Sequence, residues 1–279
     1  MDGTDAQDAL RIMSPVARRY LGDMPELVNH HDLDDAALRR AAQGDPWVMH
    51  IVVRKESGLP AESLLRAVVK ALFGCAAAFE RDPAYSDAFA AWYAQSFRKV
   101  ALVADERQWA RLQEELPCAL AEDERGRPVV ACLPPRLKSA QEPALKRLQT
   151  LKGELVGADP QEDALYQAVF VVNGALPLSL GKAVAQVGHA ALMLARSPLA
   201  DDERYAVRLE RWRANPASRF LVADAVQWEA LKRELDCVVV RDGGLTEVAA
   251  GSETVLACPP PDWGPLRGPL AGLKPLPEA

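Results

Sequence analysis

The chain has 279 residues, of which 49% are hydrophobic and 26% charged, a composition typical of globular proteins and a length that allows two domains. It contains no run of about 18 apolar residues, and its start, Met1–Asp5, is acidic and polar, so we expect neither a membrane span nor a secretory signal and predict a cytoplasmic protein. The net charge of −6 argues against a general nucleic-acid-binding protein, although it is compatible with a local basic patch.

The first 45 residues are predicted to form an acidic, partly helical extension. Acidic residues at 32–35 precede Arg39 and Arg40, and this order of charges favours a helix because it complements the helix dipole. Gly44–Pro46 then ends the helix, since glycine and proline both interrupt helical structure. The first globular domain is therefore predicted to begin at residue 46.

An internal repeat gives the domain organisation. Leu102–Asp105 recurs as Leu221–Asp224, an offset of 119 positions, and ten of the seventeen positions from 102 to 118 are identical in 221–237 without a gap. Chance does not explain this agreement, so we predict two tandem copies of one domain. The predicted parts are two domains, a polar linker between them and an irregular tail rich in proline and glycine, at 46–137, 164–262, 138–163 and 263–279 respectively.

Each copy has the sequence pattern of a small α/β domain. In the second copy, short apolar runs typical of strands occur at Ala168–Asn173, Phe220–Asp224, Cys237–Arg241 and Glu253–Cys258. Stretches rich in alanine and leucine follow the first run, and Val226–Leu235 has helical periodicity. The order strand, helix, helix, strand, helix, strand, strand predicts a three-layer domain in which helices cover a mixed sheet of about four strands.

The cysteines are interpreted as small buried hydrophobic residues. They are odd in number, they show no Cys-x-x-Cys spacing, and four of them lie in or beside apolar runs. We therefore predict no metal site, no disulfide and no cofactor. The five are Cys75, Cys118, Cys132, Cys237 and Cys258.

The first candidate motif lies in the second copy, where Gly181-Lys182 follows a strand and a loop and should open a helix. Lys182, Gln186 and His189 then share one face of this helix, at i, i+4 and i+7. The positive end of the helix, with its unpaired N–H groups and the lysine charge, suits a phosphate or a developing oxyanion. Taken alone, the motif is also compatible with a solvated lysine and a packed histidine.

The second candidate motif begins where a strand ends in Asp242 and a Gly-Gly pair turns the chain. A plain hairpin, with the aspartate capping its own turn, would account for this part of the motif. A plain hairpin does not explain a second polar set on the return strand, namely Thr246, Gly251 and Ser252.

Together the two motifs resemble the type 2 peptidyl-tRNA hydrolase family. Gly-Lys-x-x-Ala-Gln-x-Gly-His-Ala is similar to the first signature of that family, and Asp-x-Gly-x-Thr followed by Gly-Ser-x-Thr-Val-Leu to the second. The resemblance covers residues 160–262 and implies a mixed four-stranded α/β fold, usually a homodimer. It also implies hydrolysis of the ester that joins a peptide to the 3′ ribose of tRNA, with no metal or other cofactor.

Site residues follow from this resemblance by position. Lys182, Gln186, His189, Asp242 and Thr246 fall on the polar positions of the family. We expect Asp242 to orient or deprotonate the attacking water beside Thr246, and Lys182 to stabilise the oxyanion or hold a phosphate. Gln186 and His189 would position the substrate or brace the lysine. Substrate contacts are also expected from Gly181, Gly251 and Ser252.

Two departures from the family pattern bear on function. The loop Pro177–Leu180 carries no charge where family members have lysines, which reduces the expected affinity for RNA. Arginines further along the chain offer a substitute, or are a solvated helix face: Arg204, Arg208, Arg211 and Arg213.

The first copy has lost most of the signature. Glu62-Ser63 replaces Gly181-Lys182, and the positions of Gln186, His189 and Thr246 are taken by Ala67, Lys70 and Arg127, while Asp123 remains opposite Asp242. We predict that this copy is inactive and replaces the second subunit of the family dimer, so that the chain forms a pseudo-dimer.

Three functions remain open on the sequence. The first is a peptidyl-tRNA hydrolase, for which the retained motifs of the second copy argue. The second is a binding or regulatory module with weakened catalysis, favoured by the degenerate first copy and the uncharged loop. The third is an esterase for a small acylated substrate, without any RNA.

Overall fold

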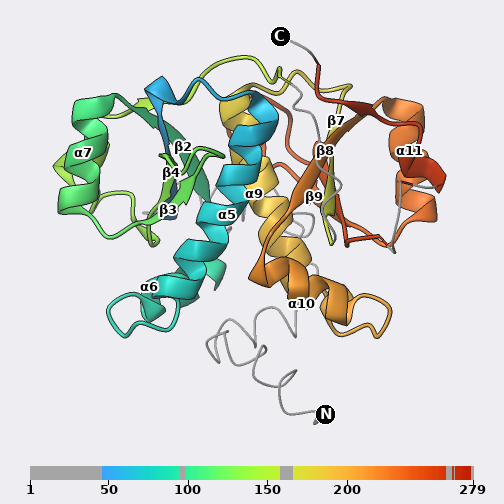
Figure 1. The fold of residues 1–279 in the computed structure, drawn as a ribbon, viewed down its shortest axis with the longest axis horizontal. Coiled ribbons are helices and arrows are strands. Elements are labelled where there is room, and N and C mark those ends of the chain that lie inside the picture. Colours follow the sequence, from blue (N-terminus) through green and yellow to red (C-terminus); the bar gives the residue numbers. More distant parts are fainter. Residues whose placement is uncertain (1–45, 95–97, 158–165, 262–265, 267, 278–279) are drawn as a thin grey trace.

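The computed structural model describes residues 46–94, 98–157, 166–261, 266 and 268–277, so the predicted extension at 1–45 lies outside the described residues. Two units of sheet and helices stand side by side, and helices α5 and α9 lie between the two sheets (Figure 1). Among the described residues, no helix has the length and apolar character needed to cross a bilayer.

The two units have the same order of elements, which is the order predicted from the sequence. In the first unit the elements are β1 (Trp47–Arg54), α5 (Ala61–Phe79), α6 (Ser86–Ala94), β2 (Lys99–Ala104), α7 (Glu106–Glu115), β3 (Ala119–Glu122) and β4 (Pro128–Cys132). In the second they are β7 (Ala168–Asn173), α9 (Leu180–Arg196), α10 (Ala206–Ala214), β8 (Ser218–Ala223), α11 (Ala225–Glu234), β9 (Val238–Arg241) and β10 (Glu253–Cys258). Short 3₁₀ turns occur at Lys55–Ser57, Pro198–Ala200 and Gly268–Leu270. This arrangement is consistent with a tandem repeat.

Each unit contains a mixed sheet, as predicted. The four main strands have the order β3-β4-β1-β2 in one sheet and β9-β10-β7-β8 in the other. The pairs β1–β2 and β7–β8 are parallel, and the remaining main pairs are antiparallel. Because a parallel pair needs a crossover, the helices α5 and α6, or α9 and α10, connect its two strands.

Three two-residue strands extend the sheets beyond the four predicted strands, one of them in the predicted linker and one in the predicted irregular tail. β5 (Arg136–Leu137) pairs with β1, and β6 (Gln149–Thr150), in the predicted linker, adds to the free edge of β2. The linker also contains the short helix α8 (Pro143–Lys146). In the tail, which was predicted to be irregular, the two-residue strand β11 (Lys274–Pro275) pairs with β8.

The linker and the tail share one pattern and one position. Both have leucine at every third residue, Leu145, Leu148 and Leu151 in the linker and Leu270, Leu273 and Leu276 in the tail. Each segment runs past the helix that follows the parallel edge strand and pairs with that strand. The two-unit likeness therefore extends beyond the predicted domain ends at 137 and 262.

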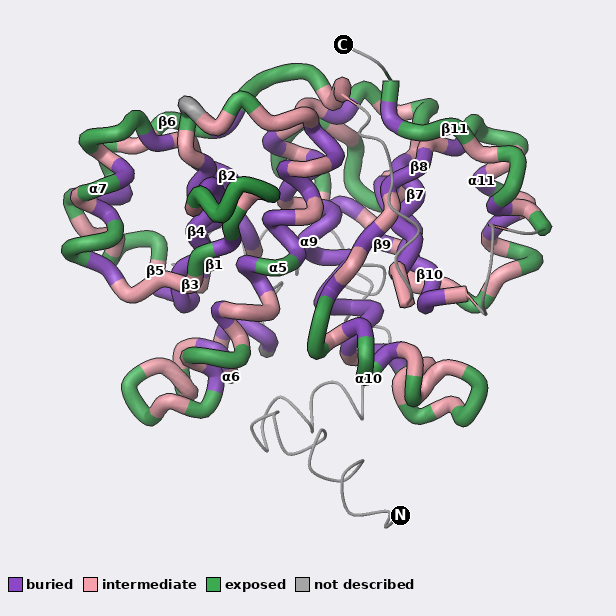
Figure 2. The backbone as a smooth tube through the Cα atoms, in the orientation of Figure 1, coloured by how far each residue is buried: buried purple, intermediate pink, exposed green. Residues whose placement is uncertain are grey.

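The core has three parts. One cluster lies between α7 and the first sheet, and a matching cluster lies between α11 and the second sheet. The third and largest lies between the two sheets and joins residues of both units around α5 and α9, where Figure 2 shows α9 buried along most of its length. The two units thus share one continuous apolar core, which links their stabilities.

A buried ion pair joins the ends of the two central helices. Arg196, the last residue of α9, donates to both carboxylate oxygens of Glu80, just after α5, at 2.9 and 3.1 Å. Its guanidinium also lies 3.9 Å from the ring centroid of Tyr93. Because loss of the arginine would leave the buried Glu80 carboxylate without its partner, this pair ties the ends of the two helices together.

Candidate functional site

The site is built at the beginning of α9, where a local cap joins the helix to the loop after β9. Ser179 accepts a hydrogen bond from the Lys182 amide through its hydroxyl oxygen, at 3.2 Å. The carboxylate of Glu247 in turn accepts from the Ser179 amide at 2.9 Å and from its hydroxyl at 2.6 Å. These bonds hold residues 242–247 over the first turn of the helix, so the two sequence motifs meet.

Lys182 and Asp242 form the centre of the site. The ammonium nitrogen lies 2.5 Å from Oδ2 of Asp242 and donates to Oγ1 of Thr246 at 2.8 Å. Only 9% of the lysine side chain and 6% of the aspartate side chain are exposed. The structure thus brings together the three residues predicted to be catalytic, and it does so in a largely dry environment where electrostatic interactions are strengthened.

Gln186 connects this pair to the sheet. Its Nε2 donates to Oδ2 of Asp242 at 2.7 Å, and its Oε1 accepts from the hydroxyl of the fully buried Thr254 at 2.8 Å. The Thr254 hydroxyl is also 3.2 Å from the carbonyl oxygen of Val240. Sequence reasoning did not select Thr254, although it is the threonine of the Gly-Ser-x-Thr motif and so was visible there.

Backbone bonds give Asp242 its orientation. Its Oδ1 accepts from the amide of Gly244 at 2.8 Å, which makes the tight turn expected of Asp-Gly-Gly. Its own amide donates to the carbonyl of Ser252, and its carbonyl accepts from the amide of Gly251. Gly251 and Ser252 therefore close the base of this loop through their backbones and do not line the cavity, whereas substrate contacts were predicted for them.

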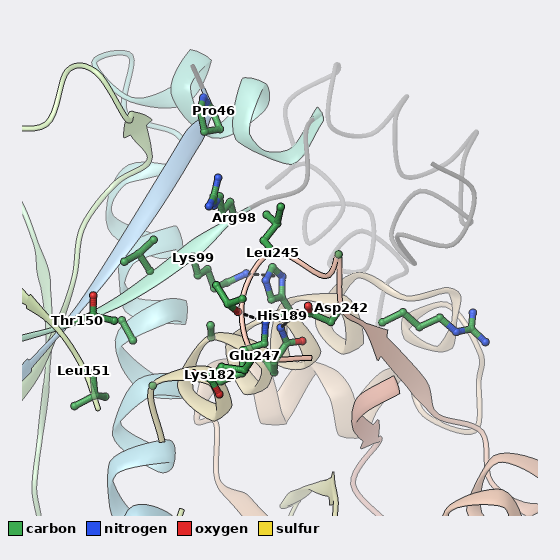
Figure 3. A pocket seen from close by; sticks show the side chains of 18 residues that line it. Pro46, Arg98, Lys99, Thr150, Leu151, Lys182, His189, Asp242, Leu245 and Glu247 are labelled. Atoms are coloured by element: carbon green, nitrogen blue, oxygen red, sulfur yellow. Dashed lines mark hydrogen bonds and ion pairs between the residues drawn. The ribbon is translucent and has the colours of Figure 1, made fainter. Parts of the chain in front are cut away.

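A cavity of about 200 Å³ opens between the two units beside this cluster (Figure 3). The second unit lines it with the predicted residues Gly181, Lys182, Gln186, His189, Asp242 and Thr246, together with Leu245 and Glu247. The first unit contributes the start of β2 and the linker strand, among them Arg98, Lys99, Thr150 and Leu151. No pattern within the second copy could have revealed these contributions, because only the fold brings them to the site.

His189 faces the first unit rather than Lys182. Its Nδ1 lies 3.2 Å from the Nζ of Lys99, as the dashed line in Figure 3 shows. Burial lowers the pKa of the Lys99 ammonium well below its usual range, since desolvation disfavours the charged form. This contact directs His189 toward the first unit, and its place on the cavity wall agrees with a role toward substrate, so its bracing of Lys182 stays a prediction.

The charges on the cavity wall are mostly paired. Lys182 is paired with Asp242, and the guanidinium of Arg241 lies 2.9 Å from Glu253. Arg98, in contrast, makes no side-chain ion pair with any described residue and is half-buried at the cavity. The carboxylate of Glu247, which accepts from Ser179, likewise makes no ion pair with a described residue, so the cavity wall carries one unpaired charge of each sign.

The helix start is more occupied than the sequence suggested. The amide of Leu180 donates to the carbonyl of Gly153, and those of Lys182 and Ala183 to the hydroxyl and carbonyl oxygens of Ser179. The linker lies so close that a Cβ on Gly181 would come within 2.1 Å of the Leu151 carbonyl oxygen. Three of the first four amides are thus satisfied, which differs from the expected row of unpaired N–H groups.

The arginines offered as substitutes for the missing lysines lie on or beside α10, away from the cavity. They are Arg204, Arg208, Arg211 and Arg213. Arg204 pairs with Asp202 at 2.7 Å and with Asp236 at 3.0 Å, and the others donate to neighbouring oxygens. None of the four lines the cavity, so the alternative of a helix face engaged with its own surroundings describes them.

The corresponding position in the first unit has lost the cluster. Asp123 is paired with Arg127 at 2.7 Å, and the buried Glu62 with Arg66 at 3.4 Å. Asp123, Arg127 and Arg66 border a wider hollow that includes Lys70 and the start of β8. No group there matches the lysine–aspartate–threonine arrangement of the second unit.

The fold and the site together define a small α/β domain with a buried lysine–aspartate pair at an open cavity. Residues 166–267 match the family model described as peptidyl-tRNA hydrolase PTH2. The match supports the resemblance to the type 2 peptidyl-tRNA hydrolase family that the two motifs indicated, and it covers the second unit. No curated protein was found to match the chain.

Proposed function

We propose that the second unit hydrolyses the ester between a peptide, or an N-blocked amino acid, and the 3′ ribose of tRNA. The observation that carries this proposal is the Lys182–Asp242–Thr246 cluster on the wall of a cavity, within the segment that matches the family. An ester is cleaved when water attacks its carbonyl carbon, so the site must supply a base for the water and a donor for the oxyanion.

Asp242 is placed to act as the base. A carboxylate offers about four acceptor positions. Three are used, two on Oδ2 by Lys182 and Gln186 and one on Oδ1 by the amide of Gly244. The remaining position on Oδ1 can accept a proton from a water in the cavity while the other bonds hold the carboxylate still.

Lys182 is placed to stabilise the oxyanion. An ammonium group has three N–H donors, and two of them are directed at Asp242 and Thr246. The third is available to the carbonyl oxygen of the ester as negative charge develops on it. Thr246 fixes the direction of the ammonium, so the donor is oriented before the substrate arrives.

Asp242 both accepts and returns the proton that moves during hydrolysis. The water oxygen bonds to the carbonyl carbon and gives one proton to Asp242. The bond between that carbon and the ribose oxygen then breaks, and protonated Asp242 returns the proton to the ribose oxygen. The products are a free peptide carboxylate, with one further proton released to water, and a tRNA whose 3′-terminal ribose hydroxyl is restored.

The residues around the cluster can contact the 3′ end of an RNA, although the chain as a whole is acidic. Arg98 offers a cation to a terminal phosphate at the cavity opening. Leu245, which is 53% exposed on the cavity rim, offers an apolar contact for a base or an amino-acid side chain. Both contacts are local, so they require no basic surface elsewhere on a chain of net charge −6.

The test is release of the blocked amino acid from N-acetyl-aminoacyl-tRNA, measured with wild type, Lys182→Ala and Asp242→Asn. Each substitution is expected to lower kcat/KM by roughly 10²–10⁴-fold. Asp123→Asn, the matched change in the first unit, should leave turnover unchanged because Asp123 is paired only within its own hairpin. Wild-type turnover no faster than spontaneous hydrolysis, by folded protein, would contradict the proposal.

The two alternatives separate in the same assay. A binding module would retain tRNA without hydrolysing it. Because few cations of this acidic chain lie at the cavity to contact phosphates, such binding should weaken only gradually with salt. An esterase for small substrates would cleave an N-acetyl amino-acid ester of a simple alcohol as fast as the tRNA ester. For that function, the cavity of about 200 Å³ is large enough for the acyl group.

A further inference from the structure

Lys99 opens strand β2 of the first unit, but its side chain reaches the active-site helix of the second. It is 6% exposed, its Nζ lies 3.2 Å from Nδ1 of His189, and the same nitrogen is 4.9 Å from the ring centroid of Trp92. The side chain is therefore fixed at its base, by the strand, and at its tip, by an aromatic ring and a histidine.

Gly188 makes room for this side chain on α9. A Cβ at this position would lie 3.0 Å from Cδ and 3.3 Å from Cε of Lys99, and 2.9 Å from a methyl group of Leu72. These distances are tighter than ordinary packing, so a side chain at 188 would press on both the leucine and the lysine stem, each of which must move by at least a few tenths of an ångström. The helix is thus shaped to admit Lys99 one residue away from His189.

The contact between Lys99 and His189 has no counterpart at the repeat-equivalent positions, where the first unit has lost the motifs. At the offset of 119 positions, Ser218 corresponds to Lys99 and Lys70 to His189. Ser218 is buried with its hydroxyl donating to the Pro216 carbonyl at 3.4 Å, and Lys70 is exposed. A general requirement for joining the two units would have placed the same pair on both sides, so the asymmetry associates Lys99 with the retained site.

We infer that Lys99 of the first unit is a positioning residue for the hydrolase site of the second unit, acting by donating a hydrogen bond to Nδ1 of His189. A neutral imidazole that accepts at Nδ1 carries its proton on Nε2, so this bond selects the tautomer of the ring. The inference rests on the proposed function for its catalytic consequence. An ammonium group can only donate, whereas a neutral amine can also accept from Nδ1–H, so the tautomer of His189 reports directly on the direction of this bond.

The inference gives the first unit a direct role in the reaction. His189 lines the cavity that holds Lys182 and Asp242, so the orientation of its ring affects where the substrate is held. A complete site then requires both units, because neither unit alone contains both the histidine and the group that orients it.

The test combines a spectroscopic signature with kinetics on the full chain. Lys99→Met removes the donor and keeps an unbranched apolar stem against Gly188 and Trp92. In ¹⁵N-histidine NMR spectra, wild-type His189, assigned with His189→Gln, is expected to show a protonated Nε2 and an unprotonated Nδ1. In Lys99→Met both nitrogens should move toward a mixture of tautomers, while His50, buried in β1, keeps its signals.

The kinetic expectation is a fall in kcat of about ten- to a hundredfold with KM within about twofold, since orientation rather than affinity is lost. Lys70→Met, at the corresponding place in the first unit, should change neither kcat nor the His189 signals. Gly188→Ala is the second variant, because its Cβ displaces Lys99 without removing it, and it should shift the tautomers in the same direction.

Each outcome bears on one of the two proposals. Unchanged His189 tautomers in both variants, or an unchanged kcat despite shifted tautomers, would overturn the inference. If wild type hydrolyses no tRNA ester but Lys99→Met still shifts the tautomers, the orienting bond is supported and the hydrolase function is rejected. Shifted tautomers together with a lower kcat support both.

Discussion

His50 is a buried titratable residue that makes the first unit sensitive to pH. It is fully buried on β1, with its Nε2 2.7 Å from Nε2 of Gln141. Burial, with a smaller effect of Arg136, lowers the pKa of His50 from 6.5 to about 4. In the unfolded chain the imidazole protonates near its ordinary pKa, so the unfolded state binds a proton that the folded state excludes.

The sign follows from this difference. Above pH 6.5 His50 is neutral in both states and its contribution to stability is fully present. As the pH falls from 6.5 toward 4, stability is lost, by about 2 kcal/mol at about pH 5. We predict that His50→Val, which copies Val169 of the second unit, flattens this dependence in urea unfolding curves. An equally steep loss in the variant would show that other groups cause it.

At the residue scale, the sequence predicted the local part of the site and missed the rest. Lys182 and Gln186 are four residues apart on one helix, so their common face could be read from spacing alone. Asp242 was recognisable at the end of a strand before a glycine pair. Lys99 was not, because it is 90 residues from His189 and no local pattern relates them. Only the packing of β2 against α9 does so.

At the element scale, two capping boxes explain why one stretch of sequence is repeated so closely. Asp105 accepts from the amide of Gln108, whose side chain accepts from the Asp105 amide, and Asp224 and Gln227 make the same reciprocal bonds. The tryptophan that follows each glutamine is buried under the helix, against the sheet. The repeated residues therefore begin a helix and fix its packing.

These caps give a matched pair of variants. Asp105→Ala and Asp224→Ala are each expected to lower the free energy of unfolding by about 0.5–2 kcal/mol, because each leaves amides at a helix start without an acceptor. Denaturant titration of the two variants and the double variant checks this. The sites are on opposite outer faces, so the effects should add, as long as unfolding remains a single transition. A change in only one variant would contradict the equivalence of the two helices.

The order of the main elements was predictable because strand and helix periods differ strongly in this sequence. The two-residue strands β6 and β11 were not, since two residues carry no periodicity. They form because the edges of β2 and β8 leave backbone groups that a neighbouring segment can pair. Their one sequence signal was the repeated spacing of three leucines in the linker and tail.

At the scale of the whole molecule, the shared core and the cavity between the units favour a fused pseudo-dimer, which we propose as the architecture. The core between the sheets contains residues of both units, and Gly188 on α9 lies against Leu72 on α5. A unit on its own would expose this apolar face to water. The first unit is then needed for stability even though its own motif is lost.

Cutting the chain between the units tests this architecture without removing any described contact. A protease site placed within residues 158–165 leaves the linker residues 151–157 on the first unit, still against the start of α9. Because the interface is continuous with the core and contains the buried pair of Arg196 and Glu80, we predict that the cut halves stay together at micromolar concentration.

The readout is the mass of the cleaved protein by size-exclusion chromatography with light scattering, with ester hydrolysis measured on the same sample. Retained mass and turnover are expected, together with self-association or precipitation of the second unit when it is produced alone. Arg196→Met leaves Glu80 buried without its partner and so weakens the association of the two units. The effect should be larger in the cleaved protein, where no peptide bond holds the two units together. A second unit that is monomeric, as stable as in the full chain and equally active would show that the first unit is an independent neighbour.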